Sequence, residues 1–544
     1  MSPARETLIT EYGEVAKALL KSNRNEEEDY DVIVVGSGMG GGVVAASLLD
    51  EGKKVLVLEA GSLLFPTHVG NLSRRLLIGK FQKHVWSLWD NFSVKNYNNL
   101  PNSVYEGGQG FNLGGRSILW GGSIPRLSKW ELEVWPPDIQ HYLINDGGYD
   151  YAEGVFNAER PVPQNFTKKS IKILSDTLGA EWNIDFGPVA VEYAGPTEWS
   201  IPAGLFSTAD LLLEDAMVEG LSQTTETRRS LTVNLNHAVW EVLFDPNKKE
   251  RATGVRCHDL LDDKIRIYKA KAVVLSAGAL ESAKIALNSG ITDGDVGRGI
   301  VDHAIYYRHF VVPPDTLKSL GLEPPVPSGT PPRNEPQSAR LLIRHEAATM
   351  EKYAFDVIVE FGAQFNQGRY VDPDDVREDL TVRQGHMLCE IVFQFYAPLM
   401  KDNVVQLAPG GHHGNAVEIY MEAAPVPDAI LDQARDLAAK VFKKLNALPV
   451  LDENPLYVEG TSVPILTPAK VGGVAHEVGT LRMPVDGAKG VVDKDLKFEG
   501  YENLFACDNS VFPCSPAGNP SLTLVALAGR CAKKVAAYVS TLPA

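Results

Sequence analysis

Gly36, Gly38 and Gly41 form the pattern G-x-G-x-x-G, directly after the apolar run DVIVV and at the start of an apolar, helix-like run. The first glycine permits a tight turn, the second lets a pyrophosphate approach the backbone, and the third lets the helix pack on the strand. The phosphate then sits at the helix N-terminus, where unpaired N–H groups and the macrodipole favour negative charge. This spacing predicts a dinucleotide site.

Glu59 supports the same interpretation, because it ends the next apolar run, KVLVLEAG. An acid about 20 residues beyond the glycines accepts hydrogen bonds from a ribose diol. The alternative is a glycine-rich turn that only packs, but strand, helix and acid all stand in register here. Residues 31–61 therefore predict a βαβ unit, and the pattern alone leaves both NAD and FAD open.

Further sheet-like segments recur along the chain. Residues 271–290 predict a strand that turns into a helix, and residues 502–513 predict another strand of the same domain. Between them, residues 311–464 alternate proline-rich loops with strand-like runs such as 387–399 and 415–426. We expect an α/β fold, in which a discontinuous Rossmann-like cofactor domain carries an inserted α+β substrate domain built on an antiparallel sheet.

The predicted boundaries follow from this pattern. Residues 1–27 form an N-terminal helical extension. The cofactor domain comprises 28–160, 226–310 and 465–544, and the substrate domain comprises 161–225 and 311–464.

Composition narrows the class of partner. With 44% hydrophobic and 22% charged residues the chain predicts a packed globular protein. Its formal charge of −17, without a long basic stretch, argues against nucleic acid and favours a neutral small molecule. The five cysteines lack paired short spacings, and we see neither a secretory signal nor a membrane-spanning run. We therefore expect a cytoplasmic protein with no membrane partner, and the sequence leaves a homo-oligomer open.

Seven segments, in their present order, resemble the glucose-methanol-choline (GMC) oxidoreductases. They are the N-terminal βαβ unit, GGRSILWGG (114–122), SAGALESAKIALNSG (276–290), GRGIVDH (297–303), HEVGTLRM (476–483), GVVDKDLKFEGYENLFACDNSVFP (490–513) and AGNPSLT (517–523). Within that family, G-G-x-S-x-x-W with Pro125-Arg126 after it, and the ending G-N-P-S-L-T, look most similar to pyranose oxidases and C-glycoside oxidising enzymes. The resemblance implies FAD rather than NAD.

The resemblance also implies roles for individual residues. It places His476 and Asn519 on the substrate side of the flavin ring, and Asp508 near the ribityl and pyrophosphate part of FAD. The other residues that it implies for the cofactor are Gly114, Gly115, Ser117, Asn509, Pro520 and Ser521.

Two positions depart from the sugar oxidases that this chain resembles. Relatives of the pyranose oxidase type attach FAD through a histidine where this chain has Leu119, and leucine cannot form that bond. We therefore expect non-covalent FAD. Gly121 stands where fungal sugar oxidases carry a threonine associated with oxygen chemistry. The electron acceptor is accordingly O₂ or a quinone-like molecule.

Alcohol oxidation requires loss of a hydroxyl proton and transfer of a hydride to flavin N5. His476 is the candidate base, because imidazole titrates near neutral pH, and the Asn519 amide can hold the same oxygen. A lone histidine is more often structural, and Asn519 is also a candidate N-cap, with Pro520 at the first helical position and the run 521–539 after it. The capping and catalytic roles of Asn519 can coexist.

Gln394 and Tyr396 are candidate substrate residues, because a strand of period two puts both on one face; the alternative is that this face simply packs. His303 is expected to stabilise the cofactor domain. No set of His, Cys, Asp and Glu has metal-site spacing, so no metal is expected.

The resemblance thus implies an FAD-dependent alcohol or carbohydrate oxidoreductase. The leading hypothesis is oxidation of a secondary hydroxyl of a pyranose, glycoside or C-glycoside, at C2 or C3, to a ketone. The alternatives are an oxidase or dehydrogenase of a non-sugar alcohol and, from another class, a non-catalytic FAD-binding redox sensor.

Overall fold

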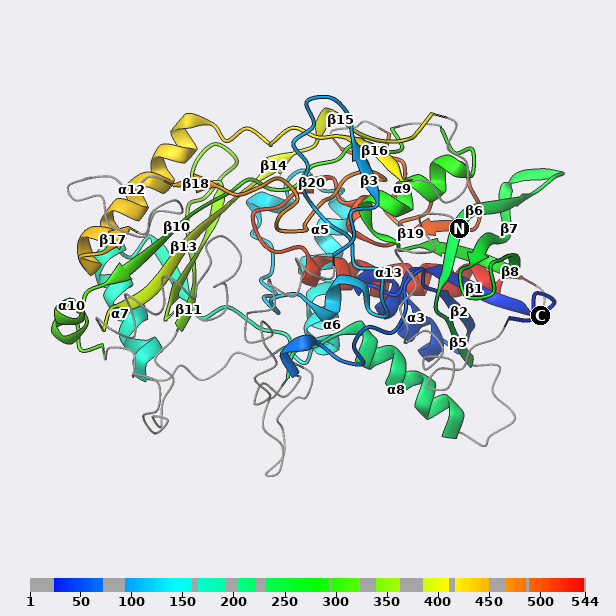
Figure 1. Cartoon of the computed structure of the whole chain (residues 1–544), viewed down its shortest axis with the longest axis horizontal. Coiled ribbons are helices and arrows are strands. Elements are labelled where there is room, and N and C mark those ends of the chain that lie inside the picture. Colours follow the sequence, from blue (N-terminus) through cyan, green and yellow to red (C-terminus); the bar gives the residue numbers. More distant parts are fainter. Residues whose placement is uncertain are drawn as a thin grey trace.

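The structure is a computed structural model that describes most of the chain (Figure 1). It describes residues 24–71, 93–158, 165–191, 204–221, 230–292, 295–322, 339–362, 385–409, 416–449, 466–485 and 489–542. Residues 1–23 of the predicted N-terminal extension lie outside this part. None of the described helices combines the length and the apolarity needed to cross a membrane.

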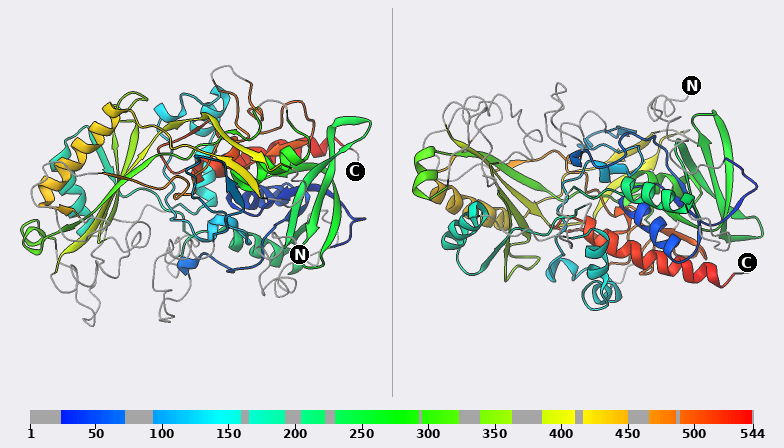
Figure 2. Two further views of the ribbon diagram at one scale, coloured as in Figure 1. Left: turned by 45° about the horizontal axis from the view of Figure 1, so that its top comes forward. Right: turned by 90° about the horizontal axis from the view of Figure 1, so that it is seen from below.

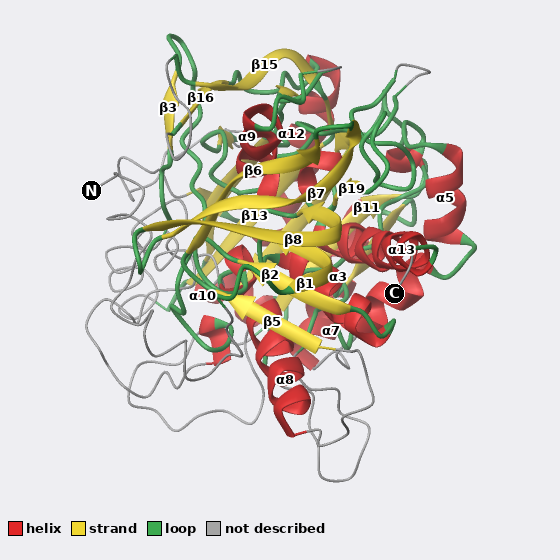
Figure 3. Ribbon diagram, turned by 90° about the vertical axis from the view of Figure 1, so that its right-hand side faces the viewer, coloured by secondary structure: helices red, strands yellow, loops and turns green. Residues whose placement is uncertain are grey.

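The first sheet has the strand order β5-β2-β1-β8-β7-β6, with β19 beside β8 (Figure 3). Its strands are β1 (Asp29–Val35), β2 (Lys54–Leu58), β5 (Ser230–Asn234), β6 (His237–Asp245), β7 (Lys248–Asp259), β8 (Lys264–Leu275) and β19 (Leu504–Ala506). β2, β8 and β19 belong to the parallel part around β1, whereas β6, β7 and β8 form an antiparallel meander. Strands from the beginning, middle and end of the chain therefore meet in one sheet, as the sequence predicts.

The predicted βαβ unit is present as β1, α3 (Met39–Asp50) and β2. α3 starts directly after Gly38, and Val32 to Val35 of β1 are buried. The predicted strand, turn and helix at 271–290 are the end of β8 and α9 (Gly278–Asn288).

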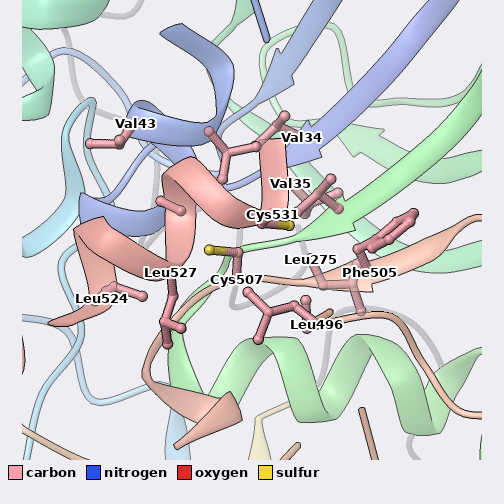
Figure 4. Packing of buried hydrophobic residues seen from close by; sticks show 14 of the residues in the cluster. Val34, Val35, Val43, Leu275, Leu496, Phe505, Cys507, Leu524, Leu527 and Cys531 are labelled. Atoms are coloured by element: carbon pink, nitrogen blue, oxygen red, sulfur yellow. The ribbon is translucent and has the colours of Figure 1, made fainter. Parts of the chain in front are cut away.

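α13 (Ser521–Ser540) packs against α3 and α6 (Gly148–Val155). Figure 4 shows side chains of α13, among them Leu524, Leu527 and Cys531, beside residues of β1, β8 and β19. This burial makes the C-terminal helix part of the cofactor domain's core. The other helical elements on this side are η1 (Val69–Asn71), η3 (Gly115–Ile118), η4 (Trp130–Leu132), α5 (Pro137–Ile144), α8 (Thr208–Leu221) and η6 (Asn509–Val511).

The second large sheet is antiparallel, with the order β17-β10-β13-β12-β11-β4 and β18 beside β10. Its strands are β4 (Trp182–Asp185), β10 (Ile305–Val312), β11 (Ala339–His345), β12 (Phe355–Phe361), β13 (Met387–Phe395), β17 (Leu448–Pro449) and β18 (Thr467–Pro468). α7 (Asn165–Leu178) and α12 (Asp428–Leu445) cover one of its faces, and α10 (Pro314–Ser319) follows β10 (Figure 2). This is the expected inserted substrate sheet.

Alternation along these strands divides the side chains between two faces. Phe355, Val357 and Val359 of β12 join the apolar cluster under the helices. Ile358 of β12 belongs instead to a smaller cluster with Val392 and Tyr307. The face opposite to α7 and α12 is therefore the one that can contribute to a binding site.

A third sheet is small and lies on the cofactor side, next to α9. It consists of β3 (Tyr97–Asn99), β9 (Arg298–Gly299), β15 (Met400–Leu407) and β16 (Val417–Tyr420), and β14 (Ala397–Pro398) pairs separately with β20 (Cys514–Ser515).

The packing therefore differs from the predicted domain boundaries in three places. β14 to β16 leave the substrate sheet, α8 packs on α3 and β5, and β10 joins the substrate sheet from Ile305 onward. Sequence periodicity identified strands and helices in these stretches but carries no information on which sheet they join.

Leu527 offers a test of the C-terminal helix as core, because its side chain is fully buried among residues of the first sheet. Replacement by alanine is expected to lower the free energy of unfolding by about 2–5 kcal/mol, through lost burial and the cavity left behind. The measurement is thermal unfolding of Leu527→Ala beside Ile265→Ala, whose parent side chain is 48% exposed. Equal destabilisation of both variants would contradict this packing.

Candidate active site

One cavity of about 260 Å³ is lined by both large sheets and by the loops between them. Its wall includes Gly36, Gly38, Glu59 and the start of β6. It also includes His476, Asn519 and four residues of the second sheet: Arg340, Ile358, Val392 and Gln394. The predicted catalytic pair and the predicted dinucleotide site thus share one cavity.

The glycine turn has the geometry that a pyrophosphate requires. Gly36 has a φ of +97°, and a Cβ there would lie 2.4 Å from the Ser276 carbonyl oxygen. A Cβ on Gly41 would lie 2.1 Å from the Gly36 carbonyl oxygen, which is the predicted close packing of helix on strand. A Cβ on Gly38 would meet no protein atom within 4 Å, so the backbone there faces open space in the cavity wall. Gly41 shapes the turn without lining the cavity.

Two buried carboxylates also line this cavity. Glu59 accepts hydrogen bonds from the Ser37 amide at 3.0 Å and from the Gly61 amide at 2.8 Å. Asp508 accepts hydrogen bonds from the Gly278 amide at 2.9 Å and from the Ser282 hydroxyl at 2.5 Å. Burial raises the pKa of both carboxyl groups, and these hydrogen bonds oppose that rise. Carboxylates held in this way can accept further hydrogen bonds from the hydroxyl groups of a dinucleotide.

The loop before η3 closes over the glycine turn. Gly114 and Gly115 have φ values of +84° and +52°, and a Cβ on Gly115 would lie 3.0 Å from the Gly38 Cα. The Ser117 hydroxyl donates to the Gly114 carbonyl at 2.6 Å. Gly115 and Ser117 line the cavity, as expected, whereas Gly114 forms the bend behind them.

These features fit FAD. The open space at Gly38 and the buried acid at Glu59 match a molecule with a central pyrophosphate next to a ribose. Asn509, Pro520 and Ser521 line the same cavity, as predicted. Sequence reasoning missed the wall formed by residues 237–240, because no spacing rule marks it, and it missed Lys284 on α9.

Arg116 holds the segment that carries His476. Its Nη1 donates to the Ala475 carbonyl at 2.5 Å and to the Glu477 carboxylate at 2.6 Å. Arg116 therefore binds the residues directly before and after the histidine. The Tyr105 hydroxyl donates to the other Glu477 oxygen at 2.5 Å. Ala475 has a φ of +61°, a conformation that non-glycine residues seldom adopt and that surrounding contacts must enforce. Arg116 of η3 therefore positions His476 through its two neighbours.

A chain of hydrogen bonds assigns the hydrogens of His476. His303 Nδ1 lies 2.8 Å from the Pro516 carbonyl oxygen, which can only accept, so Nδ1 of a neutral His303 carries the hydrogen. His303 Nε2 is then an acceptor, and it lies 3.0 Å from His476 Nδ1, which must donate. A neutral His476 consequently has its lone pair on Nε2. His303 thus contacts the candidate base directly, a role beyond the expected support of the cofactor domain.

Gln394 orients Asn519 in the same way. The Gln394 amide nitrogen donates to Asn519 Oδ1 at 3.1 Å, so the Asn519 NH₂ group is the end that remains for donation to another molecule. Both side chains line the cavity. The expected N-cap role is wrong by one position: Pro520 is the N-cap of α13, and no side chain caps this helix.

Tyr396 lies elsewhere. β13 ends at Phe395, so the strict alternation that put Gln394 and Tyr396 on one face does not reach Tyr396. Its ring contacts the edge of Trp130, with centroids 6.0 Å apart, and it does not line the cavity. Arg340, Ile358, Val392 and Val474 complete the wall beside Gln394, and nothing in the sequence had marked them.

Within the described residues, Asp302, His303 and His476 have ligand atoms within 4.8 Å of one another, close enough to surround a metal ion. The sequence gave no sign of this set, because the three residues come from two distant segments. The two histidine rings already share an N–H···N hydrogen bond.

The cavity wall therefore presents opposite polarity at two adjacent groups. His476 offers an acceptor, and Asn519 offers a donor. An alcohol hydroxyl needs this combination, since its hydrogen requires an acceptor and its oxygen accepts from a donor.

Comparison with known proteins agrees with the segments quoted above. The family models described as GMC oxidoreductase match residues 207–305 for the N-terminal domain and 415–528 for the C-terminal domain.

Curated relatives are distant and differ in substrate. A long-chain-alcohol oxidase of Arabidopsis thaliana is 23% identical over 91% of this chain and 65% of its own length, so this chain spans about two thirds of that enzyme. A paromamine 6'-oxidase of Streptomyces fradiae is 20% identical over 94% of this chain and 92% of its own length. A C-glycoside 3-oxidase of Microbacterium trichothecenolyticum is 25% identical over 78% of this chain and 75% of its own length.

Among solved structures, pyridoxine 4-oxidase from Mesorbium loti has a TM-score of 0.59 and 16% identity, covering 93% of this chain and 99% of its own. This likeness establishes the fold: an α/β cofactor domain with a substrate domain built on an antiparallel sheet.

Replacement of single glycines separates cofactor binding from folding. Gly38→Ala is expected to leave the unfolding temperature of the apoprotein unchanged and to weaken FAD binding about tenfold or more, because the new methyl group enters only cavity space. Gly41→Ala is expected to lower both the unfolding temperature and the affinity for FAD. The measurements are FAD titration of the apoprotein and its thermal unfolding, with Gly154→Ala on α6 as the control that meets no atom within 4 Å. Unchanged FAD affinity in Gly38→Ala would contradict the placement of the pyrophosphate.

Proposed function

We propose that this chain, which matches the N- and C-terminal family models of the GMC oxidoreductases, binds FAD and oxidises a hydroxyl group of a small molecule. One observation carries the proposal: His476 and Asn519 line one cavity with the glycine turn, and their neighbours give them opposite hydrogen-bonding polarity. A non-catalytic redox sensor has no need for that complementarity.

When bound, FAD would supply the acceptor for the hydride that leaves the carbinol carbon. His476 Nε2 accepts the hydroxyl proton, and the hydrogen bond from His476 Nδ1 to His303 Nε2 stabilises the charged ring that results. The Asn519 NH₂ donates to the substrate oxygen while negative charge develops there. Arg116, through Ala475 and Glu477, keeps the imidazole in place during the transfer.

We further propose that the substrate is a sugar or glycoside, oxidised at a secondary hydroxyl at C2 or C3 to the ketone. Arg340 and Gln394 supply hydrogen-bonding groups in the cavity wall beyond His476 and Asn519. One of the relatives is named as a C-glycoside 3-oxidase, and another as a paromamine 6'-oxidase.

A second candidate is a non-sugar alcohol. Ile358, Val392 and Val474 give the same wall an apolar part, which suits an alkyl or aryl group. The long-chain-alcohol oxidases among the relatives are named for such a substrate.

The cofactor is proposed to be held without a covalent bond, since Leu119 lines the cavity at the position of the expected attachment. Gly121 also lines the cavity, and a Cβ there would meet only Arg340 Nη1, at 3.8 Å. O₂ or a quinone-like molecule is the proposed electron acceptor, and location in the cytoplasm remains part of the same proposal.

The substrate class is tested by anaerobic bleaching of the flavin. Acid or heat is expected to release yellow FAD from the purified protein. Glucose or a C-glycoside is expected to bleach the bound flavin, whereas fatty and aryl alcohols are not. Bleaching by the latter alone selects the second candidate, and no bleaching by any alcohol contradicts an alcohol oxidoreductase. Reoxidation by O₂ and by benzoquinone then ranks the acceptors.

The role of His476 is tested by the rate of anaerobic flavin reduction at saturating substrate. His476→Ala is expected to retain FAD and to lose about 10²-fold in this rate, as for removal of a general base. His258→Ala serves as the control, because His258 lies on β7 beside Asp263 and outside the cavity wall. Unchanged reduction in His476→Ala would refute its assignment as the base.

A further inference from the structure

Glu131 is a fully buried carboxylate beneath the segment that carries Asn519. It belongs to η4, and its side chain has no solvent exposure. Its Oε1 accepts from the Gly518 amide at 2.9 Å, and its Oε2 accepts from the Ser128 amide at 2.6 Å. Gly518, the residue directly before Asn519, is therefore hydrogen-bonded to Glu131, which does not line the cavity.

Two strands of the substrate sheet complete this anchor. Arg344 of β11 forms a bidentate ion pair with Asp356 of β12, with Nε 2.9 Å from Oδ1, and its Nη1 donates to the Arg126 carbonyl at 2.8 Å. A Cβ on Gly518 would lie 3.1 Å from Arg344 Nη2 and 3.4 Å from Asp356 Oδ2. The backbone at Gly518 is thus held between Glu131 and this ion pair, and a side chain there would be tightly packed.

The strand pair that carries Asp356 also contacts the Asn519 side chain. Asp356 pairs with Gln394 across β12 and β13, and Gln394 donates to Asn519 Oδ1. Asn519 is therefore held at its backbone through Glu131 and Gly518, and at its side chain through Gln394.

From this arrangement we propose that Glu131 is a positioning residue for Asn519, acting in its ionised form through the Gly518 amide. The inference rests on the proposed alcohol oxidation. A carboxylate can accept from both amides, whereas a protonated carboxyl group has one oxygen occupied by hydrogen and holds one amide less well. A small displacement of a group that orients the substrate lowers the reaction rate strongly.

Ionisation of Glu131 lowers the free energy of unfolding relative to the protonated form. Burial, followed by the nearby charge of Asp356, raises its pKa to about 7, although Arg344 opposes this rise. The groups that face it are Arg344 and Asp356 from the sheet, Tyr149 from α6, and Cys514 from β20. A carboxyl group with a raised folded-state pKa stabilises the fold fully below its unfolded value, and this contribution is lost as pH rises through about 7.

The decisive experiment compares wild type with Glu131→Gln, which mimics the protonated acid, in the FAD-loaded full chain. We measure the anaerobic reduction rate at saturating substrate from pH 5.5 to 8.5, with the sugar or alcohol that bleaches wild type. The ratio of wild-type to variant rate is expected to rise from about one to about tenfold, with its midpoint near pH 7. Any pH dependence that the two proteins share cancels in this ratio.

Thermal unfolding supplies a readout that does not depend on catalysis. Relative to wild type, Glu131→Gln is expected to gain stability as pH rises from 5 to 8, while it becomes relatively slower. A residue with a purely structural role would lose rate and stability together. Glu390→Gln is the matched control, because Glu390 is equally buried on β13 and belongs to a different rung of the sheet, opposite His309 and Glu360. It is expected to show a flat rate ratio.

Gly518→Ala tests the same anchor without changing any charge. Its methyl group would lie 3.0 Å from Leu127 Cδ2 and 3.1 Å from Arg344 Nη2, so these side chains and the segment before Asn519 must adjust by a few tenths of an ångström. The reduction rate is expected to fall at every pH, with the dissociation constant of the substrate little changed.

The positioning role is overturned if the Glu131→Gln rate ratio stays flat with pH, or if Gly518→Ala reduces its flavin at the wild-type rate. Failure of wild type to be bleached by any alcohol is a different result and sinks the proposed function. In that case the unfolding data still test Glu131: a pH-independent stability difference between wild type and Glu131→Gln counts against its buried ionisation.

Discussion

The hydrogen bond between the rings of His303 and His476 joins the parts of the chain on which the site depends. His303 follows β9, His476 lies in a loop held by Arg116, and the carbonyl that fixes the His303 ring belongs to Pro516. Pro516 is in the same segment as Asn519. A single chain of contacts therefore orients the imidazole relative to the amide, and it does so before any substrate is present.

Two of the side chains that orient His476 and Asn519 belong to regular secondary-structure elements. The substrate sheet presents Gln394 to Asn519, and the cofactor loop presents Arg116 to the neighbours of His476. The second sheet thus orients the Asn519 amide, and Arg116 of η3 holds the residues on both sides of His476. Burial raises the pKa of the carboxyl groups of Glu59, Asp508 and Glu131, which reflects the energetic cost of keeping acceptors away from solvent.

Sequence reasoning predicted the parts of the fold whose signal is local. The βαβ unit, the strand and helix at 271–290 and the strand before Asp508 all follow from glycine spacing and apolar runs, and the structure confirms them. The assignment of strands to sheets was less accurate, since β14 to β16 have the same periodicity as their neighbours but pair elsewhere. The helix cap at Asn519 was misplaced by one residue because the Asn-Pro signal does not say which of the two ends the loop.

The residues of the candidate site were likewise predicted only where the signal in the sequence is local. Most of the residues singled out within motifs line one cavity. Arg116 and His303 also lie in the quoted segments, but their roles depend on contacts with distant segments that no spacing encodes, and Glu131 lies outside every quoted segment. Tyr396 shows the converse, because an alternation rule was extended one residue past the end of its strand.

The central claim is that His476 presents a lone pair on Nε2 to the cavity, and nitrogen NMR of the protein labelled with ¹⁵N-histidine tests it most directly. The imidazole signals that disappear in His476→Gln identify this ring. At neutral pH the account predicts a hydrogen on Nδ1 and none on Nε2. A hydrogen on Nε2 with a bare Nδ1 would contradict it, because the hydrogen bond to His303 would then run the other way and leave no base facing the substrate.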